Sequence, residues 1–137
     1  MLLYYFDDKA ALLAAVLEAV AGRMTALLDA HRLPHPIAAK ELEARLIPFV
    51  LDDALWPFMA LWLEIAASTA RGDPTCRAVG TAVMTGFLDW TASQLTGASA
   101  AARRRAATRV LMMVEGGVLL KSLGLGDAAT AAGQSDA

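Results

Sequence analysis

The sequence predicts an all-α protein, and three observations support this fold class. Alanine and leucine dominate the composition, while β-branched residues are few. Apolar residues recur at intervals of three and four along almost the whole chain, which is typical of amphipathic helices. No segment shows the alternation of apolar and polar residues that a strand requires. With 137 residues the chain is long enough for about one domain.

The first helix is expected to run from about Asp8 to Ala30. Its apolar stripe consists of Leu13, Val16, Leu17, Val20, Met24, Leu27 and Leu28. Asp7 or Asp8 can cap it by accepting hydrogen bonds from first-turn amides that have no helical partner. The helix should end before Pro34 and Pro36, because proline keeps the preceding residue out of the helical region.

A second helix is expected from Ile37 to Leu51, kinked at Pro48, which lacks the amide hydrogen that the helix needs there. The third, from about Ala54 to Arg71, is apolar on every side, and a helix of this kind is expected to be buried. Gly72 and Pro74 then predict a stop followed by a new start.

The fourth helix is expected from about Thr75 to Leu95, closed by the pair at 96–97. The fifth should run from about Ser99 to Leu123 and end at Gly124. The last segment, 125–137, consists mostly of small and polar residues without an apolar period, so we expect it to be frayed.

Composition excludes a disordered chain, since 57% of residues are hydrophobic and 19% are charged. The mean hydropathy of +0.47 raises the question of a membrane protein. However, the longest uncharged apolar run, Ala54–Leu63, is about half the length that spans a bilayer. Met1–Phe6 also lacks the basic head of a signal peptide. We expect a cytoplasmic protein without a membrane partner, whose surplus apolar surface forms a subunit interface, a ligand cavity or both.

Several kinds of chemistry are not indicated. A single cysteine, Cys76, excludes an internal disulfide and a cysteine-based zinc site. His31 and His35 have no partner at metal-ligand spacing, so we predict no metal site. A net charge of −2 argues against nucleic-acid binding by bulk charge. No nucleophile, phosphate loop or paired carboxylates form a catalytic motif, and we expect neither enzymatic activity nor a cofactor.

The opening of the chain carries a motif formed by Leu2, Tyr4, Tyr5, Phe6, Asp8, Lys9, Leu12 and Leu13. It resembles the segment of TetR-family transcriptional regulators in which the DNA recognition helix ends and the long connecting helix begins. Two later segments resemble the same family more weakly. They are 61–64 followed by 72–74, similar to the middle of the ligand domain, and 114–120, similar to its final helix.

The resemblance implies three regions. Residues 1–7 correspond to a remnant of the helix-turn-helix head, 8–124 to the effector-binding and dimerisation domain, and 125–137 to a disordered tail. The rest of the DNA-binding head has no counterpart in this sequence.

The resemblance also implies a role in DNA contact for three residues, in the intact protein only. The positions of Tyr5 and Lys9 contact backbone phosphates, and that of Tyr4 lies beside the DNA. The alternative is that the tyrosines pack the head against the first helix and that Lys9 is solvated.

A pocket for a small apolar or aromatic effector is expected from the large aromatic and methionine side chains that the family places around a cavity. These are Phe49, Trp56, Phe58, Met59, Trp62, Met84, Phe87, Trp90, Met112 and Met113. Glu64 and Glu115 could orient a cationic group on the ligand. The alternatives are an ordinary core for the apolar residues, and arginine pairing or solvent exposure for the acids.

Gly116 and Gly117 lie in mid-helix, where each costs about 1 kcal/mol relative to alanine. Close approach of another helix would offset this cost. By resemblance, the last two helices pair with their symmetry mates in a homodimeric four-helix bundle. A tight crossing within one chain is the alternative.

The sequence therefore favours the ligand-binding and dimerising part of a TetR-like regulator, a repressor in most of the family, which meets operator DNA only when the head is present. The other hypothesis is an all-helical dimerising module with a filled core and no ligand.

Overall fold

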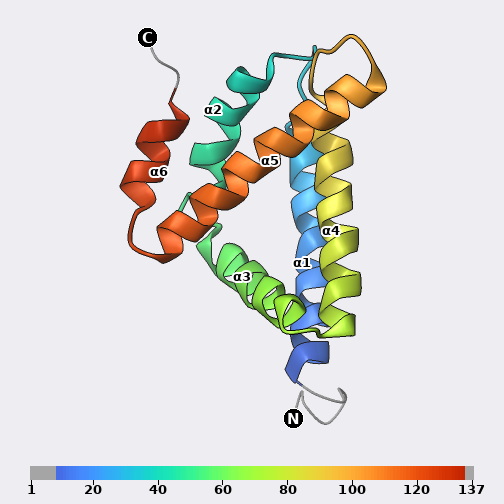
Figure 1. The fold of residues 1–137 in the computed structure, drawn as a ribbon, viewed down its shortest axis with the longest axis vertical. Helices are drawn as coiled ribbons and strands as arrows, with labels where there is room; N and C mark the ends of the chain where they lie inside the picture. The colour runs from blue at the N-terminus through green and yellow to red at the C-terminus, as the bar shows by residue number, and fades with distance from the viewer. Residues whose placement is uncertain (1–8, 135–137) are drawn as a thin grey trace. The chain divides into compact units, whose positions relative to one another are not determined.

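The structure is a computed structural model that describes residues 9–134, in which helices are joined by short connections (Figure 1) and one isolated β-bridge links Ile37 and Leu95. The predicted all-α class is confirmed, with six helices in the described range rather than the five expected. They are α1 (Lys9–Ala30), α2 (Ala39–Val50), α3 (Trp56–Ala70), α4 (Pro74–Ser93), α5 (Ala100–Ser122) and α6 (Gly126–Gly133).

The chain divides into two compact units, which the sequence did not predict. Unit 1 combines the described part of Met1–His31 with Phe58–Phe87, and so contains α1, most of α3 and the first part of α4. Unit 2 combines Arg32–Pro57 with the described part of Leu88–Ala137. Each unit is described by itself below.

The core of unit 1 brings together one buried residue from each of its three helices. Leu17 of α1, Ile65 of α3 and Cys76 of α4 are at most 4% exposed. The partly buried residues packed against them are Leu13, Leu61, Trp62 and Val79. The expectation that α3 is buried on every side is wrong: Ile65 is its one fully buried residue, because the α1 and α4 residues of this core pack against the face of α3 that carries it.

The turn between α3 and α4 stops one helix and starts the next, as predicted. Gly72 has a φ of +99°, and the amide of Asp73 donates to the carbonyl of Ser68 at 3.1 Å, the pattern of a glycine C-cap. The carboxylate of Asp73 then accepts a hydrogen bond from the amide of Cys76 at 2.9 Å, which caps α4, and Pro74 occupies the first helical position.

Unit 2 is built on α5, which packs against α2 and α6 (Figure 1). The buried residues of α5 are Ala107, Val110, Val114, Gly117 and Val118. The Ser99 hydroxyl caps its start, and Gly124, with a φ of +84°, ends it as the sequence predicted. α2 contains Pro48 and buries Leu42 and Ile47.

Residues 126–133 form helix α6, although the sequence predicted a frayed tail from 125 onward. Ala129 is only 5% exposed, and a Cβ atom added at Gly133 would lie 2.8 Å from the Cδ1 of Ile47 in α2. The absence of large apolar residues suggested that nothing anchored this segment. Its small residues instead let α6 approach α2 and α5 closely, and the resulting van der Waals contacts hold the helix in place.

The proline-containing turn after α1 is held by Gln94, a residue that sequence reasoning missed. Its side chain is 2% exposed, and its Oε1 accepts a hydrogen bond from the amide of Leu33 at 2.9 Å. The backbone of Ile37 also pairs with Gln94 and with Thr96, at 2.9 Å and 3.0 Å. No local sequence pattern marks Gln94, which stands between Ser93 and Leu95.

One helix in the described range, α1, is long and apolar enough over Ala11–Ala30 to cross a membrane, by length and composition alone. Core helices of soluble proteins and signal sequences meet the same criterion, so this is weak evidence for a membrane span.

Candidate functional site

The twelve residues predicted to line an effector pocket divide equally between the two units. Unit 1 holds Phe58, Met59, Trp62, Glu64, Met84 and Phe87, and unit 2 holds Phe49, Trp56, Trp90, Met112, Met113 and Glu115. The pocket therefore remains a prediction, and its two halves are considered in turn.

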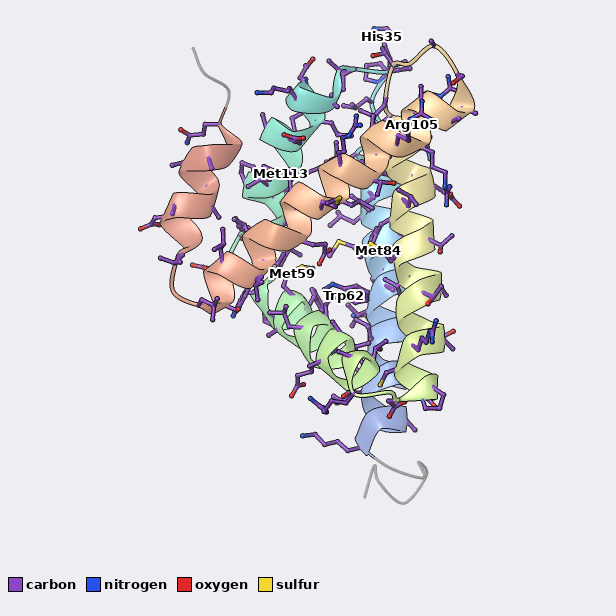
Figure 2. The ribbon with its side chains drawn as sticks, in the orientation of Figure 1. His35, Met59, Trp62, Met84, Arg105 and Met113 are labelled. Atoms are coloured by element: carbon purple, nitrogen blue, oxygen red, sulfur yellow. The ribbon has the colours of Figure 1, made fainter. Side chains whose placement is uncertain are left out.

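In unit 1 the apolar candidates are partly buried. Trp62 of α3 packs on the core, and a Cβ atom added at Gly80 of α4 would lie 3.9 Å from its ring (Figure 2). A Cβ atom at Gly80 would thus make ordinary van der Waals contact with α3. Glu64, in contrast, is exposed. Trp62 has the packing of a core residue.

In unit 2 the environment of Trp90 is unusual. Its indole Nε1 is buried and has no hydrogen-bond partner among the described residues. A buried N–H group without an acceptor costs roughly 1–3 kcal/mol. Such a donor is a natural point of attachment for a ligand that carries an acceptor.

Trp56 lies beside a cation rather than in an apolar pocket. The Nζ of Lys121 stands 5.0 Å from the centre of its ring, within the range of a cation–π interaction. The same amine contacts the carbonyl of Leu51 and the carboxylate of Asp53. These contacts of Lys121 join α5 to Trp56 and to the segment between α2 and α3.

Met112 and Met113 of α5 are 69% and 47% exposed. Met112 belongs to a larger exposed apolar surface, which we call the α5 face. Its members are Met112, Gly116, Leu119, Leu120 and Leu123, which follow one another at helical spacing. Leu119 and Leu123 are 52% and 67% exposed.

Gly116 lies within the α5 face and has no heavy atom within 4 Å of the position that a Cβ atom would take. Gly117, the next residue, lies about 100° further around the helix, and its Cβ position lies 3.7 Å from Leu51 and 3.9 Å from Ala129. A Cβ atom at Gly117 would therefore make ordinary van der Waals contacts within the chain, whereas one at Gly116 would make none.

The residues predicted to contact DNA fall mostly outside the described range. Tyr4 and Tyr5 lie outside it, and Lys9 is the first residue of α1, with an exposed side chain. Within residues 9–134, no group of three or more histidine, cysteine, aspartate or glutamate residues could hold a metal ion.

The chain matches no protein-family model, and comparisons with curated proteins and with solved structures gave no significant match.

Proposed function

We propose that the chain is the effector-binding and dimerisation part of a ligand-responsive transcriptional regulator of the TetR type, acting as a repressor. The observation that carries the proposal is the α5 face, an exposed apolar helix surface with an uncovered glycine within it. An effector domain of this kind functions as a homodimer, so it needs a surface that binds a second copy of the chain.

The chemistry of the α5 face fits a second copy of the same chain. Burial of apolar surface contributes about 25 cal/mol per Å², and four large side chains contribute here. Gly116 lets the backbone of a facing helix come close. In a two-fold symmetric dimer both copies contribute the same surface. The α5 face of one copy would therefore pack against the α5 face of the other.

Support for an effector comes from Trp90 and from the predicted pocket residues. An apolar or aromatic molecule with one hydrogen-bond acceptor would satisfy the buried indole N–H. Flexible methionines such as Met59 and Met84 adapt to molecules of varied shape.

In the intact protein, effector binding would shift the orientation of α1 and so change the spacing of two DNA-binding heads. DNA affinity would fall, because the spacing of half-sites is fixed by the helical repeat of the duplex. Tyr5 and Lys9 would contact backbone phosphates, with Tyr4 beside the DNA. The effector acts only through its different affinity for the two arrangements.

The second candidate is an all-helical dimerising module without a ligand. The packing of Trp62 against Gly80 and the unit 1 core favours it, because there the tryptophan fills space rather than lining a cavity.

Dimerisation is tested by Leu119→Glu, with Val16→Glu as the matched control. Val16 is an exposed apolar residue of α1, 42% exposed, outside the α5 face. In analytical ultracentrifugation we expect Leu119→Glu to yield monomers and Val16→Glu to remain dimeric. Equal behaviour of the two variants would contradict an interface on α5.

The effector is tested by native mass spectrometry of the purified chain, which detects a co-purified small molecule. We expect an adduct that is reduced in Trp90→Phe, a variant that keeps an aromatic ring but lacks the indole N–H. A dimer that shows no adduct and binds no apolar compound in a ligand screen would favour the module without a ligand.

A further inference from the structure

Two exposed arginines extend the line of the α5 face toward the start of its helix. Arg105 and Arg109 precede Gly116 by eleven and seven residues, so at about 100° per residue both lie within about 20° of it around the helix axis. Both side chains are exposed (Arg105 is labelled in Figure 2), and neither forms an ion pair within residues 9–134. The exposed line of α5 thus begins with two positive charges and ends with leucines.

No negative charge of α5 lies on this line. Each of the other charged residues of the helix lies at least about 100° around the axis from Gly116, and these are Arg103, Arg104, Glu115 and Lys121. Arg104 and Lys121 have carboxylate partners within the chain, Asp89 at 2.9 Å and Asp53 at 2.7 Å respectively. Arg105 and Arg109 are therefore the charges that a helix packed on the α5 face would meet.

The exposed line is nearly symmetric about Gly116. Met112 and Leu120 each stand four residues from it, about 6 Å along the axis, and Arg109 and Leu123 each stand seven residues from it, about 10 Å. Two α5 helices that cross antiparallel at Gly116 therefore bring Met112 of one copy opposite Leu120 of the other, and Arg109 opposite Leu123. A parallel crossing brings each residue opposite its own counterpart.

Charge decides between these two arrangements. A parallel pair sets Arg105 and Arg109 against the same arginines of the second copy and aligns the two helix dipoles. An antiparallel pair instead sets the arginines beside the C-terminal end of the facing helix, which carries partial negative charge. The aliphatic stem of Arg109 then covers Leu123, which is 67% exposed in the single chain.

We propose that the α5 faces of two copies pair antiparallel and cross at Gly116, with Arg109 of each copy over the last turn of α5 in the other. The inference rests on the proposed dimer and adds its orientation and register.

The orientation is tested by disulfide cross-linking of a chain that carries both Met112→Cys and Leu120→Cys, beside the two single variants. We expect the double variant to form a covalent dimer on non-reducing electrophoresis. Each single variant should not, because its two cysteines lie about 12 Å apart along the crossed helices, beyond the roughly 7 Å between Cα atoms that a disulfide can bridge. Cys76 is 0% exposed and does not compete.

The other outcomes of cross-linking overturn the inference. Single variants that cross-link to themselves would show a parallel pair, as would no other result, and the proposed dimer would stand. A dimeric chain in which no variant cross-links would place the crossing away from Gly116. A monomeric chain would assign the α5 face to a different partner and overturn the proposed dimer as well.

The position of the arginines is tested by Arg109→Glu in sedimentation equilibrium. In the antiparallel pair the new carboxylate lies beside the negative end of the facing helix, so the dissociation constant of the dimer should rise about tenfold. In a parallel pair one like-charge contact would replace another, with little change. The matched control is Arg77→Glu, at an exposed arginine of α4, which should dimerise as the unaltered chain does. Equal dissociation constants for the two variants would overturn the placement of Arg109.

Discussion

The Nζ of Lys121 lies 2.7 Å from the Oδ1 of Asp53, so the last turn of α5 is joined to the segment between α2 and α3. The same nitrogen donates to the carbonyl of Leu51 at 2.5 Å and lies over the ring of Trp56. The Lys121 side chain is 19% exposed, and its apolar stem is correspondingly buried. The Lys121 amine thus contacts three groups of unit 2, namely the Asp53 carboxylate, the Leu51 carbonyl and the Trp56 ring.

Replacing Lys121 by methionine should destabilise the chain. The stem is kept, but the hydrogen bond to Leu51 is lost, and a bond from a charged donor contributes about 1.5–3 kcal/mol. Urea unfolding measures the change. The control is Lys40→Met, at an exposed lysine of α2 for which no contact is described. If both variants unfold at the same urea concentration, the Lys121 contacts contribute no stability.

The pKa of Asp53 is lowered from its ordinary value of 3.8 by the hydrogen bond from Lys121 and by the charge of that amine. A lowered folded-state pKa stabilises the fold above pH 3.8, and this contribution disappears as the pH falls through the lowered value. Asp53→Asn should therefore be less stable than the unaltered chain near neutral pH, with the difference shrinking in acid. A difference that grows as the pH falls would contradict this assignment.

Gly133→Ala should weaken the packing of α6. The new Cβ atom would lie 2.8 Å from Cδ1 and 2.9 Å from Cγ2 of Ile47, and overpacking of this kind costs about 1–3 kcal/mol. Hydrogen exchange of the α6 amides measures the effect. The control is Gly22→Ala in α1, whose Cβ atom meets open space in the single chain and which should leave the α6 amides unchanged. Unaltered exchange in Gly133→Ala would show that α6 does not pack closely on α2.

Asp73→Ala should destabilise unit 1 by about 1 kcal/mol, because the amide of Cys76 loses its cap. Glu18→Ala removes one exposed carboxylate from α1 of the same unit and is the control. Thermal unfolding should separate the two variants. Equal melting temperatures would mean that the cap contributes little.

Local signals predicted much of the fold. Pro34 and Pro36 follow the observed end of α1, and Gly72 and Gly124 stand where α3 and α5 end. These residues act through backbone sterics, which depend on few neighbours.

Features that depend on distant partners were not predicted. α6 is held by the close approach of small residues to Ile47, and such contacts leave no apolar period in the sequence. Gln94 anchors Leu33 from sixty-one residues away. The exposure of Met112 and Met113 likewise depends on what packs beside α5, which the identity of a methionine does not reveal.

The most direct test of the central claim, that the α5 face joins two copies, is sedimentation equilibrium of Gly116→Leu beside Gly22→Leu. A Cβ atom at either glycine meets no atom within 4 Å in the single chain, so both variants should fold with a stabilised helix. We predict that Gly22→Leu remains a dimer and that Gly116→Leu becomes a monomer. A monomeric unaltered chain, or a Gly116→Leu variant that dimerises as tightly as the unaltered chain, would contradict the account.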